Sequence, residues 1–162
     1  MELLYNLIDQ TAKNWGAGPW QHEPDRIWWT EPSGLKCAIN RNPSLGHLTG
    51  YVGVPFEHPL FESSYDDIQG VMQVHGGLTY SGGLWFHDLA TDVDDPHWED
   101  MAGLQWFGFD CGHFMDIVPG MGHFLEAHAP DWTADKTYKT VDYVYHETTL
   151  LAVQIRNWVW DD

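Results

Sequence analysis

Two short segments of this 162-residue chain combine side chains that can transfer protons or bind a metal ion. Residues 109–116 read Phe-Asp-Cys-Gly-His-Phe-Met-Asp, so two carboxylates flank one imidazole at spacings of three residues. If the chain turns at the intervening glycine, Asp110, His113 and Asp116 converge on one point, which suits an acid/base pair or a divalent metal. The structural alternative is that these polar groups bond nearby backbone at a strand end, with Cys111 as a small core residue.

The second segment, residues 74–80, places an imidazole directly before two glycines. Gly76 and Gly77 let the backbone turn sharply behind His75 and approach a ligand closely, and Thr79 adds a hydroxyl group. The structural alternative is a glycine-containing bulge between two strands, with the imidazole half exposed. The segment therefore predicts ligand binding only in combination with the first one.

Together the two segments predict a pocket in which His75, Asp110, His113 and Asp116 are the catalytic candidates. In a metal-assisted hydrolase, Asp110, His113 and His75 bind a divalent cation that activates water, and Asp116 orients or deprotonates that water. In a metal-free hydrolase, His75 or His113 is the general base and a neighbouring carboxylate fixes its tautomer. The sequence leaves open which version applies, and a divalent metal is the one cofactor it suggests.

Two further acids are candidates for supporting this pocket. Asp67, next to Asp66, either caps a short helical segment or faces a metal, and capping is the simpler interpretation. Glu147 lies at the edge of an apolar helical stripe, close enough to reach a site beneath it, although an exposed carboxylate is the simpler interpretation. His58 precedes a proline and is predicted to be a turn residue rather than a ligand.

The elements that must position these groups are short strands between two helices. Apolar residues recur at helical spacing over residues 2–14 and again over residues 138–159, where they predict a helix of about six turns. This order predicts a single α+β domain, residues 1–162, with a mainly antiparallel sheet packed by an N-terminal helix and a long C-terminal helix. The strand candidates are residues 27–31, 35–40, 48–54, 71–75, 78–80, 84–87 and 104–111, and residues 88–103 are expected to be the least ordered.

The charge of the chain is strongly negative and unevenly distributed. The chain has seven Lys and Arg residues and 24 Asp and Glu residues, which gives a net charge of −17. Residues 42–135 contain no Lys or Arg. Binding to duplex DNA or to an anionic membrane requires clustered cations, so we expect neither. A site in this stretch is expected to work with carboxylates, imidazoles, backbone groups or a metal.

The remaining composition indicates a soluble protein. Two cysteines are too few for a disulfide framework, and no segment has a signal-peptide pattern or the ~20 apolar residues of a membrane helix. We therefore expect a cytoplasmic protein with reduced thiols.

Six segments together resemble a family of small, largely uncharacterised proteins from bacteriophages and prophages: GYVGVP, HPLF, YDD, VHGGLTYSG, WFGFDCGH and YVYHETTLLAVQI. The resemblance covers roughly residues 50–155, and the family has Ala where this chain has Gly112 and Ala-Gly in place of Phe114 and Met115. It implies a phage context, hence the cytoplasm of a bacterial host, and no established activity. Small phage accessory proteins often counter host defences by removing a signalling molecule or by blocking a defence protein.

Two functions from different classes follow. The first is a phage-type accessory protein that handles a small-molecule ligand in the His/Asp pocket, as a metal-assisted or His-based hydrolase. The second is a non-catalytic acidic inhibitor that mimics nucleic acid and blocks a basic groove of a host protein, with acids such as those at residues 92–100 as its contacts. A charge that only maintains solubility is the plain alternative to both.

Overall fold

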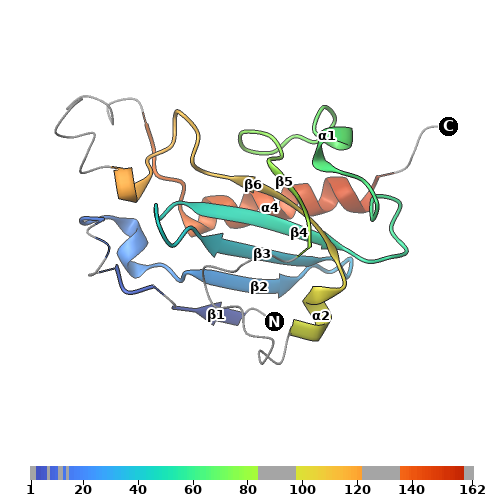
Figure 1. Ribbon diagram of the computed structural model, residues 1–162, viewed down its shortest axis with the longest axis horizontal. Helices are drawn as coiled ribbons and strands as arrows, with labels where there is room; N and C mark the ends of the chain where they lie inside the picture. The colour runs from blue at the N-terminus through green and yellow to red at the C-terminus, as the bar shows by residue number, and fades with distance from the viewer. Residues whose placement is uncertain are drawn as a thin grey trace.

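The computed structural model describes residues 3–6, 8–10, 13, 15–83, 98–121 and 136–158. They form a six-stranded antiparallel sheet in the order β1-β2-β3-β4-β6-β5, with one long helix lying across one face (Figure 1). The strands are β1 (Leu3–Tyr5), β2 (Arg26–Thr30), β3 (Lys36–Arg41), β4 (Leu48–Val54), β5 (Tyr80–Gly82) and β6 (Gln105–Asp110). The helices are α1 (Tyr65–Ile68), α2 (Trp98–Ala102) and α4 (Val141–Arg156), with 3₁₀ turns at Pro19–His22 and Pro119–Met121. The predicted α+β class, mainly antiparallel sheet and long C-terminal helix are confirmed.

The helix predicted over residues 2–14 is wrong at its start. Leu3–Tyr5 is the edge strand β1, whose residues pair with β2 in the register Leu3 with Trp28. A short apolar run fits either element, and the unpaired outer edge of β2 offers backbone partners that override the local helical pattern. Leu4 is 61% exposed, so it is not part of a buried helical stripe.

The strand predicted at residues 71–75 is also absent, because the chain there turns out of α1. The N–H groups of Val71 and Met72 both donate to the carbonyl of Ile68, which closes a turn. The outer edge of β6 is occupied instead by β5, where Tyr80 pairs with Gly108. The predicted strand at residues 84–87 and the acids at residues 92–95 lie outside the described residues.

The core lies between the sheet and α4. The helix residues buried against the sheet are Val144, Thr148, Leu151, Ala152 and Ile155. They pack over alternate residues of β3 and β4, including Ile39 and Val52. Gly50 permits this close approach, since a Cβ atom at that position would lie 2.4 Å from the Thr148 Oγ1 atom. Each fully buried Leu or Ile here contributes about 1.5–3 kcal/mol.

Helix α4 is shorter than predicted and has defined ends. It begins after Thr140, whose Oγ1 accepts the Tyr143 N–H at 3.3 Å, so Tyr138 precedes the helix. Near its C-terminal end, His58 Nε2 lies 2.9 Å from the carbonyl of Ile155, and His58 Nδ1 accepts the Leu60 N–H. The prediction that His58 is a turn residue is confirmed. None of the helices within the described ranges combines the length and the apolar character needed to cross a bilayer.

Candidate functional site

The candidate site lies at the N-terminal end of α4, where three segments of the chain meet. The segment after β6 pairs with the segment before α4 through a parallel bridge between Asp116 and Thr137. The Ile117 N–H donates to the Thr137 carbonyl at 2.9 Å, and the Thr137 N–H donates to the Met115 carbonyl at 3.2 Å. The glycine loop that contains His75 supplies the third segment. This pairing brings residues far apart in sequence to the same place.

The centre of the site is a buried carboxylate bonded to an imidazole. The Asp116 side chain is fully buried, and its Oδ2 lies 2.8 Å from His75 Nε2 and accepts the His113 N–H at 3.1 Å. Its other oxygen lies 3.3 Å from Lys139 Nζ. Because a carboxylate only accepts hydrogen bonds, the His75 ring carries its proton on Nε2.

The second nitrogen of the same ring faces a phenol. His75 Nδ1 lies 2.9 Å from the Tyr143 hydroxyl, and the two rings meet edge to face with their centroids 5.4 Å apart. The Tyr143 hydroxyl also lies 3.4 Å from Glu147 Oε1, one turn further along α4. A continuous line of hydrogen bonds therefore runs from buried Asp116 to Tyr143, whose side chain reaches solvent at 37% exposure.

The electrostatics of this line fix its protonation states. Burial alone would raise the pKa of Asp116, but hydrogen bonds from His75 and from the His113 N–H, together with Lys139, outweigh it and hold the pKa below its usual value. Partial burial, and then the Glu147 carboxylate, raise the pKa of Tyr143. At neutral pH the line thus has a carboxylate at its buried end and a phenol at its outer end.

A second imidazole packs beside the first. His113 Nε2 lies 3.5 Å from Asp110 Oδ1, and the rings of His75 and His113 lie 6.0 Å apart between centroids. Gly76 has a φ of 69° and gives the His113 ring its space, since a Cβ atom there would come within 2.2 Å of Nε2. Gly77 follows with a φ of 81°. The two glycines thus form the sharp turn that the sequence predicts.

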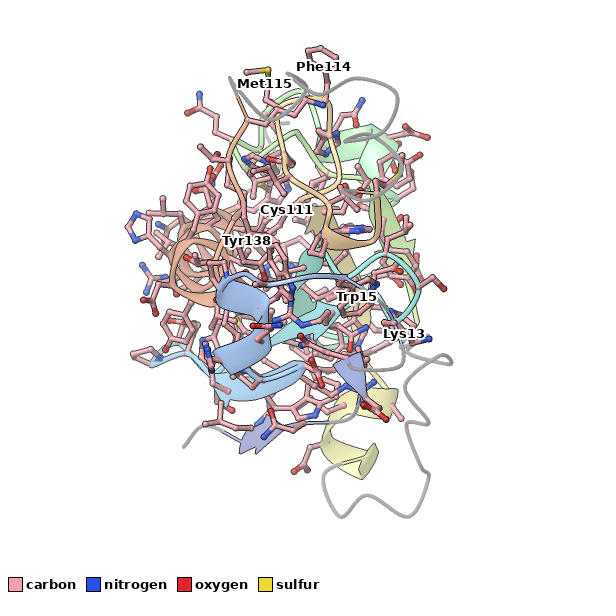
Figure 2. The ribbon with its side chains drawn as sticks, turned by 90° about the vertical axis from the view of Figure 1, so that its left-hand side faces the viewer. Lys13, Trp15, Cys111, Phe114, Met115 and Tyr138 are labelled. Carbon is pink, nitrogen blue, oxygen red and sulfur yellow. The ribbon has the colours of Figure 1, made fainter. Side chains whose placement is uncertain are left out.

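Two neighbouring groups are buried in a neutral form. The pKa of His47 lies below its usual value, because the effect of burial exceeds the opposing effect of the nearby Asp110 and Asp116 carboxylates. Burial, and then Asp116 and Asp110, raise the pKa of the Cys111 thiol, which is 2% exposed. Cys111 is therefore a small core residue, as in the structural alternative, and not an activated nucleophile. Figure 2 shows it inside the molecule, with Phe114 and Met115 at the outer tip of the same segment.

The metal set predicted from the sequence does not assemble. Within the described ranges, no three His, Cys, Asp or Glu side chains are arranged to hold a metal ion. His75 bonds Asp116 and Tyr143, while His113 faces Asp110, so Asp110, His113 and His75 do not share one point. The geometry favours the metal-free version of the chemistry.

The other predicted residues divide between the site and the scaffold. Glu147 reaches the site through Tyr143. Asp67 is in a capping box, where its Oδ2 accepts the Ser64 N–H at 3.0 Å, so the capping interpretation is confirmed. Thr79 is exposed, and its N–H donates to the Gly108 carbonyl at the start of the β5–β6 pairing. The described contacts of Asp67 and Thr79 are thus not with His75.

Sequence reasoning missed Tyr143 and Lys139. Tyr143 has a sequence signal, because it precedes Glu147 by four residues and so shares its helix face. Lys139 has none, since the bridge at Thr137 is what carries it to Asp116. The expectation that a site within residues 42–135 works without a permanent cation is therefore wrong, and its cation comes from outside that stretch.

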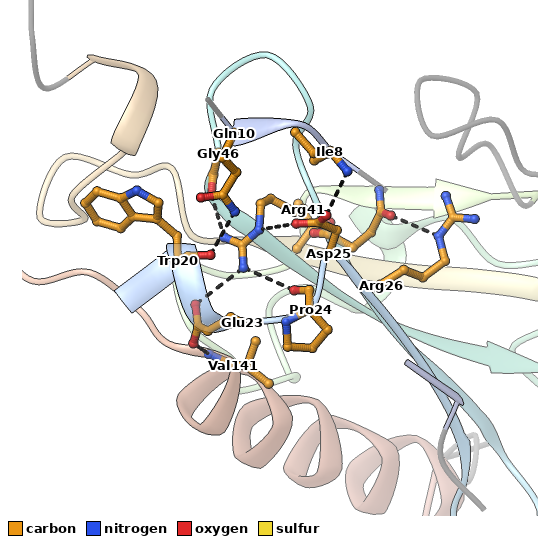
Figure 3. A network of polar contacts seen from close by, with 12 residues as sticks. Ile8, Gln10, Trp20, Glu23, Pro24, Asp25, Arg26, Arg41, Gly46 and Val141 are labelled. Carbon is orange, nitrogen blue, oxygen red and sulfur yellow. Dashed lines mark hydrogen bonds and ion pairs between the residues drawn. The ribbon is translucent and has the colours of Figure 1, made fainter. Parts of the chain in front are cut away.

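A hollow of about 560 Å³ lies in a different region, between residues 6–10 and 15–25. Its carboxylates are already bonded: Asp25 accepts Arg41 Nε at 3.0 Å and the Ile8 N–H at 2.9 Å, as Figure 3 shows. Glu23 accepts the Tyr138 hydroxyl and the Val141 N–H, each at 2.6 Å. These contacts hold the N-terminal segments against β3 and the start of α4.

No protein-family model, curated protein or solved structure matches this chain. What is shown is the class of protein, an α+β fold with one antiparallel sheet and a carboxylate–imidazole–phenol line at one helix end. The resemblance to phage proteins stays a prediction.

Proposed function

We propose that this protein is a ligand-handling enzyme of the hydrolase type, in which His75 accepts and returns a proton without a metal. The observation that carries this proposal is the 2.8 Å contact between His75 Nε2 and the buried Asp116 carboxylate. A carboxylate in this position fixes the tautomer of the imidazole and stabilises the positive charge that forms when the ring accepts a proton. General acid–base catalysis of this kind contributes a factor of about 10²–10⁴ in rate.

The charges around the site favour a ligand whose reacting group is uncharged, such as an ester or an amide. Lys139 is paired with Asp116, and Arg41 is fully buried against Asp25, so neither is placed to receive a phosphate. Asp110 and Glu147 flank the two imidazoles and repel anions. Phe114 is 80% exposed beside the site, with Lys136 Nζ 4.7 Å from the centroid of its ring, and its remaining exposed surface offers an apolar contact to the rest of the ligand.

The resemblance to phage proteins suggests what hydrolysis at His75 would serve in the cell. We infer that the ligand is a small molecule of a bacterial host and that the protein removes it, which would counter a defence that depends on the molecule. The proposal therefore places the protein among phage accessory proteins with an enzymatic rather than a blocking action.

The test compares hydrolysis of an uncharged ester, p-nitrophenyl acetate, with hydrolysis of p-nitrophenyl phosphate. We expect the wild type to prefer the ester and His75→Gln to lose about 100-fold in kcat/KM. His146→Gln is the matched control, since His146 is an exposed histidine on the same helix α4. Circular dichroism confirms that each variant is folded. A folded His75→Gln variant with full activity would contradict the proposal.

One observation favours the second candidate function, an acidic inhibitor. Arg26 and Arg41 are 3% and 0% exposed, so two of the seven cations do not contribute to the surface. Asp25 and Asp116 are each 2% exposed, so burial among the described residues removes as many carboxylates as cations and leaves the net charge of −17 undiminished. An inhibitor would bind a lysine oligomer with an affinity that falls steeply with salt, and His75→Gln would leave that affinity unchanged. Salt-insensitive binding would count against this function.

A further inference from the structure

Both ring nitrogens of His75 are occupied by other side chains. Nε2 lies 2.8 Å from the Asp116 carboxylate, and Nδ1 lies 2.9 Å from the Tyr143 hydroxyl. In a simple catalytic dyad, one nitrogen bonds the carboxylate and the other faces the substrate. Here the second nitrogen faces a phenol, so the group at the solvent end of the line is the Tyr143 hydroxyl.

We propose that Tyr143 is the catalytic residue that touches the substrate and relays protons between it and His75. This inference rests on the proposed function and adds the residue through which His75 acts. Its substrate class is a neutral carbonyl compound, an ester or an amide.

The relay balances over one hydrolytic cycle. Water attacks the carbonyl carbon and gives a proton to the Tyr143 oxygen, while the Tyr143 hydroxyl gives its own proton to His75 Nδ1. The resulting imidazolium is held by Asp116. When the bond to the leaving group breaks, the leaving group takes a proton from Tyr143, and His75 returns the proton to the phenol oxygen. One water is consumed, and the three side chains recover their starting states.

The surroundings of Tyr143 suit this role. The titratable and charged groups that face it are His75 from the glycine loop, Glu147 from α4 itself, Lys139 from the segment before the helix, and Cys111 and Asp116 from the segment that follows β6. Partial burial and Glu147 disfavour the phenolate, so the hydroxyl keeps a proton to donate.

The position of the ring is also fixed. The backbone N–H of Tyr143 is bonded to the Thr140 side chain in the first turn of α4. Lys139 Nζ lies 5.6 Å from the centroid of the ring. The hydroxyl is thus presented to solvent by a helix end and not by a loose loop, which favours defined proton-transfer geometry.

The alternative is that Tyr143 itself is the nucleophile, because tyrosine hydroxyls form covalent intermediates in some enzymes. In that case, quenching the reaction with p-nitrophenyl acetate leaves an acetyl group on Tyr143 during turnover. Mass spectrometry of the quenched protein detects this adduct. The relay predicts an unmodified Tyr143, and an adduct that forms and decays at the rate of turnover would overturn it.

The decisive experiment compares Tyr143→Phe, His75→Gln and the double variant on p-nitrophenyl acetate, with Tyr65→Phe as the control. The relay predicts about a 100-fold loss of kcat/KM in each single variant and no further loss in the double variant, because the two residues act as one unit. If His75→Gln is inactive while Tyr143→Phe keeps full activity, the relay is wrong and the proposed function stands. If both single variants keep full activity, the proposed function is itself wrong.

A substrate-free measurement makes the relay testable even where the probe ester is not hydrolysed. The ¹⁵N spectrum of the His75 ring reports which nitrogen carries the proton. The relay predicts a proton on Nε2 and an Nδ1 signal that moves when Tyr143→Phe removes the hydroxyl. An Nδ1 signal identical in the two proteins would overturn it.

Discussion

Two tyrosine–carboxylate networks flank the first turn of α4, and they differ in what closes them. The Tyr138 hydroxyl donates to Glu23 at 2.6 Å and accepts from Arg41 at 2.8 Å. The Tyr143 hydroxyl instead faces the neutral ring nitrogen of His75 at 2.9 Å and reaches solvent. The first network is closed on a permanent, fully buried cation, whereas the second ends in a ring that can gain or lose a proton.

This difference indicates that the Arg41 network stabilises the fold and that the His75 network can transfer protons. A guanidinium stays charged at every accessible pH, and burial raises the pKa of Tyr138, so the Arg41 network serves to hold segments together. An imidazole can donate a proton from one ring nitrogen and accept one at the other, so the His75 network can carry out acid–base chemistry. The two are coupled, because Glu23 also accepts the Val141 N–H and thereby fixes the helix end on which Tyr143 sits.

The largest expected effect is the loss of Arg41. Arg41→Met leaves the carboxylates of Asp25 and Glu23 buried without their cation, which typically costs roughly 3–5 kcal/mol. Urea unfolding followed by tryptophan fluorescence measures this loss. Lys36→Met is the control, since the Lys36 ammonium bonds the hydroxyl of exposed Thr30. A loss at Arg41 no larger than at Lys36 would show that the network does not support the fold.

Removing the hydroxyl group from each tyrosine in turn is expected to affect stability in one network and hydrolysis in the other. Tyr138→Phe removes hydrogen bonds to two charged groups and is expected to lose about 1.5–3 kcal/mol of stability while ester hydrolysis per folded molecule is unchanged. Tyr143→Phe is expected to change stability by about 0.5 kcal/mol or less, as partly exposed substitutions do, while hydrolysis falls. The same urea titration and rate assay serve both variants. Equal stability losses in the two variants would contradict the proposal that Tyr138 stabilises the fold while Tyr143 acts in hydrolysis.

The smallest expected effect is a pH dependence at His47. Its pKa in the folded protein lies below the value of 6.5 because burial disfavours the charged ring. The unfolded chain therefore binds more protons below pH 6.5, and stability falls as the pH decreases from there towards the folded pKa. His47→Gln is expected to flatten the unfolding free energy in this range.

Asp116 has a separate pH window. Its folded pKa lies below 3.8, so its contribution to stability is complete above that value and is lost only as the pH falls through the folded pKa. Asp116→Asn therefore lowers stability above pH 3.8 and removes the pH dependence below that value, outside the window of His47. A slope between pH 6.5 and 3.8 that survives His47→Gln unchanged would assign it to another group.

Local patterns in the sequence predicted most of the sheet and part of the site. The β-prone run Leu48–Val54 predicts β4 to the residue, and the apolar stripe from Val144 to Ile155 predicts the buried face of α4. The glycine turn behind His75 is also readable, because its residues are adjacent. Leu3–Tyr5 was not predictable as a strand, since its state depends on the edge of β2 and not on its own residues.

The side chains that contact Asp116 and His75 could not be predicted either, because they also depend on contacts between distant parts of the chain. Asp116 meets Lys139 only through the parallel bridge to Thr137, and His75 meets Tyr143 across 68 residues of sequence. No spacing rule connects such pairs. The sequence predicted His75 and Asp116 in one pocket, with a metal or a carboxylate-bonded imidazole as the alternatives, and the structure joins the two residues by a direct hydrogen bond.

The most direct test of the link between Asp116 and His75 is the ¹⁵N spectrum of the His75 ring, recorded at mildly alkaline pH in the wild type and in Asp116→Asn. The wild-type ring is expected to hold its proton on Nε2, bonded to Asp116, and this preference is expected to weaken in Asp116→Asn. A ring that averages between both tautomers to the same extent in the two proteins would contradict the claim that Asp116 prepares His75 for proton transfer.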